Sequence, residues 1–305
     1  MISFKLKIIL ISGDLIRVRL LLFLGYYLDT VLLTKDEEPI YSIYLKFIVE
    51  NLLLINSNPE KAALSYQAID ALNSIFEDDD SVIRMSSFVK ELFPTIFSLI
   101  SIIGDQKFLE MIQNIVKYYA KYLMDCEELT AQLIHELVRK ILNEKKLLEA
   151  DNKKKKINIS MMRCWNTLRT IGENKYFIPK CLPIIESKMS PLFEIMKAGD
   201  GIFDDDIICF FTLILKNIKK LSPVMKEMFI YYSRYFEQKE CVFGPLFTTL
   251  NYYIVYESEF CCSDPKFIEM LVIMGTEALV ASGKTVNEST NADGALLLHL
   301  ILQVK

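Results

Sequence analysis

The stretch Asp206–Leu221, DIICFFTLILKNIKKL, is highly informative about the fold class of this chain. Apolar side chains cover almost the whole circumference of the helix that it would form, and polar residues gather at its ends. A helix that is apolar all round is buried on more than one side. This happens when a helix packs on its own partner and on both neighbouring repeats of a helical array. The stretch therefore favours an all-α fold of stacked helices.

Two other segments agree with that interpretation. Leu15–Leu33 is also apolar nearly all round. Its charges are confined to Arg17, Arg19 and Asp29. Glu127–Leu142 is instead amphipathic, because its leucines follow one stripe and its polar residues another, which suits the outer helix of a pair. Strand and hairpin signals are almost absent from the sequence.

Helix starts recur at a regular spacing along the chain. Capping residues and N-terminal prolines, such as Asp14 and Pro39, predict where helices begin. The first helices of successive pairs are expected to begin near residues 14, 59, 105, 158, 204 and 244. The resulting intervals of about 45, 46, 53, 46 and 40 residues lie close to the roughly 40–47 residues of HEAT and armadillo units. The predicted fold is an all-α superhelix, or solenoid, of about six to seven HEAT-type antiparallel helix pairs.

The solenoid is expected to span residues 1–305 as one domain. An exposed loop is predicted near 149–157, because EADNKKKK (Glu149–Lys156) interrupts the helical pattern and lengthens the third interval. The polar segment Ala281–Asn291 predicts a second loop. The first twelve residues resemble the tail of a helix whose partner would lie upstream, so the array is expected to lack earlier repeats.

Composition argues against several classes of protein. The 305 residues are 52% hydrophobic and include only 10 glycines and 9 prolines, which favours long helices with short connections over a loop-rich β fold. The formal net charge of −4 argues against direct nucleic-acid binding, which usually needs a basic face. No uncharged apolar run reaches the roughly 18 residues of a transmembrane helix, so no membrane insertion is expected.

Residues that commonly carry chemistry form no recognisable constellation. No metal site is expected, because the cysteines form no CxxC pair and are interpreted as reduced, buried thiols. They are Cys126, Cys164, Cys181, Cys209, Cys241, Cys261 and Cys262. His135 is expected on a polar, solvated helix face and His299 at a helix–helix contact. SGKT at Ser282–Thr285 lacks the upstream glycine of a phosphate-binding loop. The sequence therefore predicts no enzyme, no catalytic residue and no cofactor.

Two acidic clusters provide the candidate partner-binding residues. They are Glu77, Asp78, Asp79 and Asp80 in the first cluster, and Asp204, Asp205 and Asp206 in the second. One interpretation is local: a solvated turn at the first cluster, and capping of a helix dipole at the second. The other is a negative surface that attracts lysine- and arginine-rich proteins. Lys153–Lys156 is interpreted as a solvated loop, with a nuclear localisation signal or a phosphate contact as the alternative.

Aromatic residues are expected mainly in the core. Pairs such as Tyr231–Tyr232 and Tyr252–Tyr253 are predicted to fill positions between repeats, and Trp165 is predicted to anchor the core. The alternative for some of them is a shallow pocket between helices that accepts a phenylalanine from a partner.

Several segments resemble the importin-β (karyopherin-β) superfamily of nuclear transport receptors. FKLKIILISGDLIRVRLLLFLGYYLDTVLL (Phe4–Leu33) is similar to a helix pair of these receptors, with Arg17 and Arg19 in place of its two arginines. NPEKAALSYQAIDALNSIF (Asn58–Phe76) is similar to the unit that follows. Three further segments resemble later repeats of these receptors: MMRCWNTLRTIGE (Met161–Glu173), FGPLFTTLNYYIVY (Phe243–Tyr256) and DPKFIEMLVIMG (Asp264–Gly275). Their order is most similar to the central to C-terminal HEAT repeats of the branch typified by importin seven and importin eight.

The resemblance implies a receptor that carries protein cargo through nuclear pores and binds the phenylalanine–glycine repeats of nucleoporins. Such receptors work in cytoplasm and nucleus and release cargo when the small GTPase Ran binds. The N-terminal repeats that bind Ran in this family have no counterpart in the chain, and the mid-array break is the basic Lys153–Lys156 where the branch has an acidic loop. The second function left open is a HEAT-repeat scaffold or adaptor of another kind, such as a phosphatase regulatory subunit or a trafficking adaptor.

Overall fold

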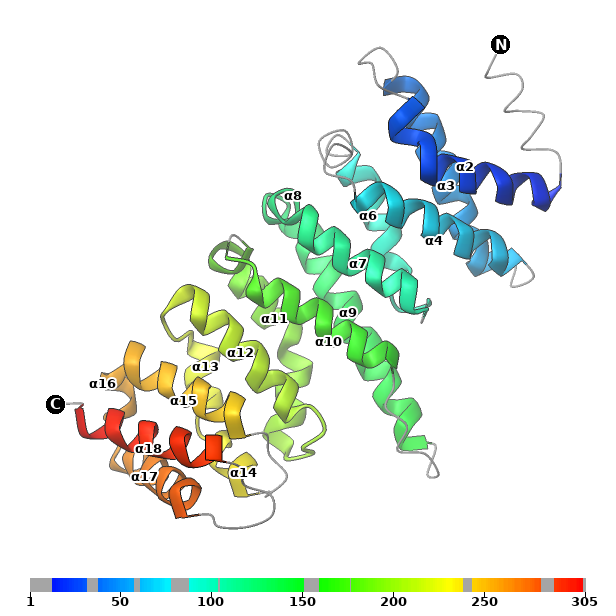
Figure 1. Ribbon diagram of the computed structural model, residues 1–305. Helices are drawn as coiled ribbons and strands as arrows, with labels where there is room; N and C mark the ends of the chain where they lie inside the picture. Colours follow the sequence, from blue (N-terminus) through cyan, green and yellow to red (C-terminus); the bar gives the residue numbers. More distant parts are fainter. Residues whose placement is uncertain are drawn as a thin grey trace. The chain divides into compact units, whose positions relative to one another are not determined.

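The computed structural model describes residues 13–31, 38–57, 61–77, 88–103, 105–150, 159–175, 177–237, 243–280 and 288–303 (Figure 1). Every regular element in these ranges is a helix, and no strand occurs among them. The all-α prediction is therefore confirmed for the described residues. The chain divides into two compact units, Met1–Thr167 and Leu168–Lys305, which are described separately below.

The helices of the first unit form pairs and short runs. They are α2 (Asp14–Val31), α3 (Glu38–Ser57), α4 (Ala62–Glu77), α6 (Val89–Ser98), α7 (Gln106–Tyr118), α8 (Ala120–Met124) and α9 (Glu127–Ala150). Helix α4 packs against α2 on one side and α7 on the other, and also against α3 (Figure 1). Helix α6 packs against α9. Helix α10 (Ile159–Glu173) begins in this unit and ends in the second.

Aromatic side chains fill the core of the first unit. Phe76 of α4, Phe93 of α6 and Tyr119 after α7 are all fully buried. Their rings meet edge to face, with centroids 6.0 Å apart for Phe76 and Phe93, 5.5 Å for Phe76 and Tyr119 and 5.4 Å for Phe93 and Tyr119. Such T-shaped pairs place the positive ring edge against the negative ring face. The cluster therefore joins α4 and α6 to the residue that follows α7.

The second unit has longer helices connected by short ones. They are α11 (Phe177–Ala198), α12 (Asp204–Ile218), α13 (Pro223–Met228), α14 (Tyr231–Glu237), α15 (Phe243–Tyr256), α16 (Ser258–Cys261), α17 (Pro265–Val280) and α18 (Glu288–Gln303). Helix α12 packs against α11 and α15, and α18 packs against α15 and α17. Figure 1 shows α12, α15 and α18 side by side, in the order of the chain.

Another aromatic cluster occupies the core of this unit. Phe229 is buried and its ring lies 5.2 Å from Tyr253, 5.5 Å from Phe260 and 5.1 Å from Phe267, measured between centroids. Tyr232 and Tyr253 are fully buried, as is Trp165 at 2% exposure near the end of the first unit. The prediction of a core position is therefore confirmed for Tyr232, Tyr253 and Trp165, whereas Tyr231 and Tyr252 are partly exposed.

The predicted helix starts agree closely with the structure. Helices begin at Asp14, Ala62, Gln106, Ile159, Asp204 and Phe243, against predicted starts near 14, 59, 105, 158, 204 and 244. Helix α6 was not predicted, because the residue before it is Phe88, whose side chain makes no capping hydrogen bond. Helix α12 ends at Ile218, earlier than predicted, because Lys219 has the left-handed conformation at φ 52° and terminates it.

None of the helices that the structure describes is long and apolar enough to cross a lipid bilayer.

Candidate functional site

The acidic triplet at the start of α12 comprises one buried residue, Asp204, and two partly exposed residues, Asp205 and Asp206. Asp204 is only 1% exposed, and its Oδ1 atom has no hydrogen-bond partner among the described residues. Burial raises the pKa of the Asp204 carboxyl to about 6. The Arg234 guanidinium opposes this rise, and the neighbouring Asp205 and Asp200 carboxylates add to it. Asp204 is therefore not a carboxylate that a partner protein could reach.

Asp206 forms an ion pair with an arginine of helix α10. Its Oδ1 atom accepts a hydrogen bond from Arg169 Nη2 of α10 at 2.6 Å. Burial raises the pKa of Asp206 to about 6, although Arg169 acts in the opposite direction. Asp205 is partly exposed and lies in the same first turn. This placement favours the local interpretation of Asp204 and Asp206, as acids at a helix N-terminus, over an open negative surface.

The other charged segments singled out by sequence lie largely outside the described residues. Glu77 is the last residue of α4, and nothing further is described of its side chain. Asp78, Asp79 and Asp80 lie outside the described ranges, as do Lys153–Lys156 and Ser282–Thr285. The role of the first acidic cluster therefore stays a prediction.

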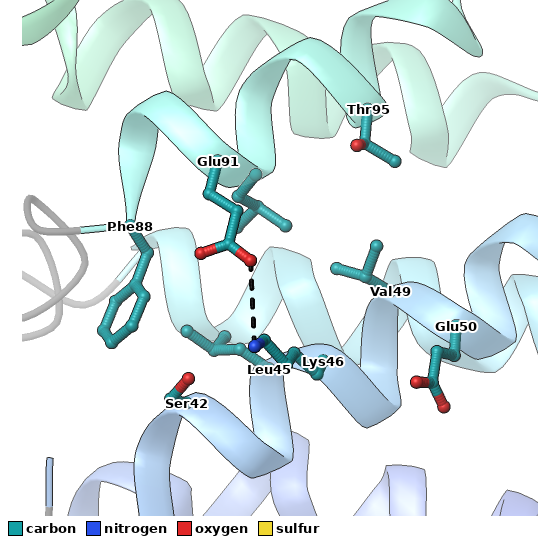
Figure 2. A pocket seen from close by; sticks show the side chains of 9 residues that line it. Ser42, Leu45, Lys46, Val49, Glu50, Phe88, Glu91 and Thr95 are labelled. Atoms are coloured by element: carbon teal, nitrogen blue, oxygen red, sulfur yellow. Dashed lines mark ion pairs between the residues drawn. The ribbon is translucent and has the colours of Figure 1, made fainter. Parts of the chain in front are cut away.

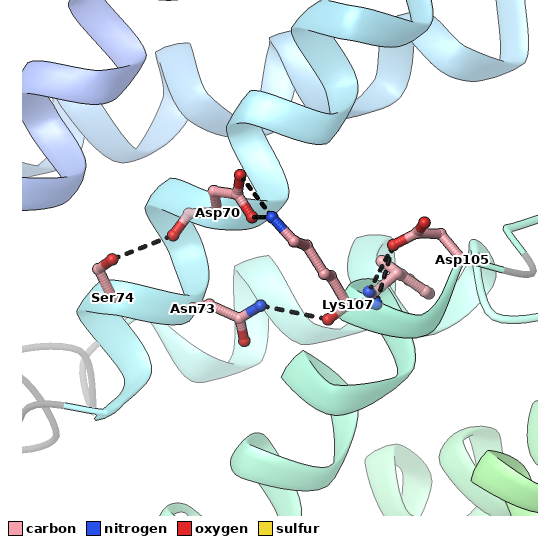
Figure 3. Close-up of polar contacts among 6 residues, drawn as sticks. Asp70, Asn73, Ser74, Asp105 and Lys107 are labelled. Carbon is pink, nitrogen blue, oxygen red and sulfur yellow. Dashed lines mark hydrogen bonds and ion pairs between the residues drawn. The ribbon is translucent and has the colours of Figure 1, made fainter.

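Polar side chains connect successive helices of each unit. In the first unit, Lys107 Nζ at the start of α7 lies 2.8 Å from Asp70 Oδ1 of α4, and Asn73 Nδ2 donates to the Lys107 carbonyl at 3.2 Å (Figure 3). The hydrogen bond and charge of Asp70 raise the pKa of Lys107. Asp105 accepts hydrogen bonds from Lys107 N and Phe108 N and so caps α7.

Equivalent contacts recur in the second unit. Asn217 Nδ2 of α12 donates to the Gly172 carbonyl of α10 at 2.8 Å. The hydroxyls of Thr212 and Thr249 hydrogen-bond to each other between α12 and α15. Tyr253 donates its hydroxyl to the Met225 carbonyl at 2.7 Å. Many polar groups on the helix interfaces thus set the register between neighbouring helices rather than face a ligand.

A shallow depression lies between α3 and α6 of the first unit. Figure 2 shows Leu45 and Val49 of α3 facing the side of α6 that carries Glu91 and Thr95. The volume of this depression is about 160 Å³. Lys46 Nζ and Glu91 Oε1 lie 3.8 Å apart across it, and both side chains are more than 60% exposed. An ion pair this exposed contributes little to stability, so a bound side chain could displace it.

A larger groove lies between α14 and α17 of the second unit, and we name it the α14–α17 groove. Its volume is about 720 Å³. The apolar side chains that line it are Ile230, Phe236, Phe267, Met270, Ile273 and Met274. Four carboxylates, of Glu237, Asp264, Glu269 and Glu277, line it together with one ammonium group, of Lys266.

Sequence reasoning did not identify the α14–α17 groove. A signal was present in α17, where residues 266, 269, 270, 273, 274 and 277 follow the i, i+3, i+4 spacing of one helix face. The other wall comes from α14 and the residue before it, and the apposition of the two walls is a property of the tertiary structure.

Cysteines and histidines show no arrangement for catalysis in the described part of the chain. Burial raises the pKa of Cys164 and of Cys261 to about 12, which keeps both thiols protonated and poorly nucleophilic. His135 is exposed, as expected. His299 is also exposed, with its Nε2 atom 2.9 Å from Gln303 Nε2, so the expected helix contact for His299 is wrong. Among the described residues, no group of three or more histidine, cysteine or acidic side chains could hold a metal ion.

A scan of protein-family models, a search of curated proteins and a search of solved structures each found no match to this chain.

Proposed function

We propose that this chain is a HEAT-type solenoid that binds other proteins. The observation that supports it most is the recurrence of helices at the predicted spacing, with starts at Asp14, Ala62, Gln106, Ile159, Asp204 and Phe243. Within each unit, successive helices of this series pack against one another, as α4 does with α7 and α12 with α15. Stacked helix pairs create extended concave surfaces, and proteins of this architecture commonly bind other macromolecules on them.

Within this class we propose a narrower role, as a segment of a nuclear transport receptor that binds protein cargo and nucleoporin repeats. It rests on the resemblance of the segments Phe4–Leu33, Asn58–Phe76 and Met161–Glu173 to importin-β-type receptors. Shallow apolar depressions between helices, such as that beside Leu45 and Val49, fit the requirement for binding single phenylalanine side chains. A scaffold or adaptor of another kind has the same helix packing and is the alternative.

A binding experiment separates the two roles. The purified chain is passed over immobilised phenylalanine–glycine repeat peptides, with serine–glycine repeats of the same length as the control. A transport segment should be retained on the first and not on the second. Failure to bind the phenylalanine repeats would remove the transport role and leave the general scaffold.

Adding GTP-loaded Ran to the same column tests the second part of the transport role. Retention that Ran does not change agrees with a segment lacking the Ran-binding repeats of the family. Release by Ran would show that this chain contains a Ran site that the resemblance did not predict.

A further inference from the structure

The α14–α17 groove exposes apolar side chains to solvent. Ile230 is 50% exposed and Ile273 is 49% exposed, and these two residues lie on the two opposing walls. Phe236 at 8% and Met274 at 1% lie deeper and belong to the packed core. Covering a half-exposed isoleucine removes apolar surface from water, which favours binding. Burial of this apolar surface by a partner would therefore stabilise the complex.

The spacing of the wall residues suits a helical partner. Met270, Ile273, Met274 and Glu277 lie at i, i+3, i+4 and i+7, so the groove follows α17 for about two turns. An amphipathic helix docks into such a groove through apolar anchors with the same spacing. Methionine side chains are flexible and polarisable, so they adapt to the shape of the anchors.

The charges beside the groove define the chemistry of the partner. Glu237, Glu269 and Glu277 are exposed, and none of them forms an ion pair with any residue that the structure describes. Asp264 accepts a hydrogen bond from Lys266 N at 2.9 Å and so caps α17. The surplus of carboxylates favours a positively charged partner, because complementary charge speeds association and disfavours acidic competitors.

We propose that the α14–α17 groove binds an amphipathic helical segment of a partner protein, with apolar anchors on one face and lysine or arginine residues beside them. This inference rests on the proposed protein-binding function and assigns it a site. The acidic cluster Asp204–Asp206 plays no part in it.

The test uses a fluorescein-labelled peptide of 18 residues and the full 305-residue chain. The peptide carries leucine at positions spaced i, i+4, i+7 and i+11, and lysine or alanine elsewhere. Fluorescence anisotropy should show saturable binding. The substitution Ile273→Ser should weaken binding about fivefold or more, because it removes a central apolar contact. Val272→Ser is the matched control, since Val272 is exposed at 39% on the same helix but does not line the groove.

Equal weakening by the two serine variants, or no binding of the peptide to the parent chain, would overturn the proposal. Circular dichroism of both variants keeps the comparison valid, because both substitutions place serine in the same helix. A loss of peptide affinity that occurs in Ile273→Ser and not in Val272→Ser would support the groove as the binding site.

A double variant tests the preference of the groove for a positively charged peptide. The double variant Glu269→Gln/Glu277→Gln should bind the lysine peptide about threefold to tenfold more weakly than the parent chain. The affinity should also depend less on salt concentration. A glutamate peptide with the same leucines should bind the parent chain more weakly than the lysine peptide. Equal affinity for the lysine and glutamate peptides would show that the carboxylates do not select the partner and would overturn this part of the proposal.

The groove and the transport role fail in different ways. If the lysine peptide does not bind while the chain is retained on phenylalanine–glycine repeats, the groove proposal is wrong and the proposed function stands. If the peptide binds as described and the repeats do not, the groove stands and the transport role is removed.

Discussion

Asp204 shows how the environment of one residue changes the role that sequence predicts for it. In sequence it belongs to a run of three aspartates that suggested an acidic surface. In the structure its side chain is 1% exposed, at the first turn of α12, and the positive charge of Arg234 partly offsets the rise of its pKa. Burying a carboxylate without full hydrogen bonding is costly in the ionised state. The free-energy cost of burying the ionised carboxylate therefore applies mainly at pH values above the raised pKa of Asp204.

This burial predicts an unusual dependence of stability on pH. The pKa of Asp204 rises from 3.8 to about 6 on folding. Between these values the folded state binds more protons than the unfolded state, so the free energy of unfolding should fall as pH rises from about 4 to 6. Asp204→Asn should therefore stabilise the protein by about 1–3 kcal/mol at pH 7.5, with a smaller gain at pH 5. Urea unfolding at both pH values measures the difference.

Asp205→Asn is the control for that experiment. Asp205 lies in the same turn and the substitution changes the net charge equally, but its side chain is partly exposed. We expect a change within about 0.5 kcal/mol at both pH values. A loss of stability for Asp204→Asn at pH 7.5 would mean that attraction to Arg234 outweighs the cost of burial.

The end of α12 illustrates the same point for a whole element. The stretch predicted as one helix runs to Leu221, which follows Lys219 and Lys220. In the structure the helix ends at Ile218. Lys219 has a left-handed conformation, and its N–H donates to the Leu215 carbonyl at 3.0 Å. A left-handed non-glycine residue carries backbone strain that glycine does not. Nothing in the local sequence marks this position as left-handed.

Replacing the strained residue tests this description. Lys219→Gly should raise the free energy of unfolding by about 0.5–1 kcal/mol, because relief of strain exceeds the added entropy of the unfolded chain. Thermal or urea unfolding measures the change.

The adjacent residue provides a matched control. Lys220 is also exposed, and its φ is not positive. Lys220→Gly should lower the free energy of unfolding by about 0.5 kcal/mol, since only the entropic term remains. The same sign for both variants would contradict the left-handed cap.

Helix α9 was easier to predict than α6. The stripe Leu129, Leu133, Leu137 and Ile141 is buried as expected, because its spacing encodes one face of a helix within a single segment. Helix α6 is only 10 residues long, contains Pro94 and starts after Phe88 without a side-chain cap. Its position is set by packing of Phe93 and Phe97 into the core, which no local signal announces.

At the scale of the whole molecule, the proposed solenoid makes a prediction about size. A compact domain of 305 residues has a radius of gyration of about 19 Å. Helix pairs stacked along one axis would give a larger value and an asymmetric distribution of interatomic distances. Small-angle X-ray scattering on the monomer measures both, with sedimentation velocity as the control for oligomers. A radius of gyration near that of the compact domain would contradict the solenoid.

Local sequence patterns were enough to predict the helical class, the spacing of the main helix starts and the buried stripes of helices such as α9. These follow from periodicity, capping and proline placement, which act over a few neighbouring residues. Which acids are buried, and where a groove lies between helices, became known only from the packing of the folded chain. Arg169 and Asp206 are 37 residues apart in the chain, and Ile230, which precedes α14, lies across the groove from Ile273 of α17. Burial and apposition depend on such distant neighbours, so the α14–α17 groove could not be predicted from the pattern of either wall alone.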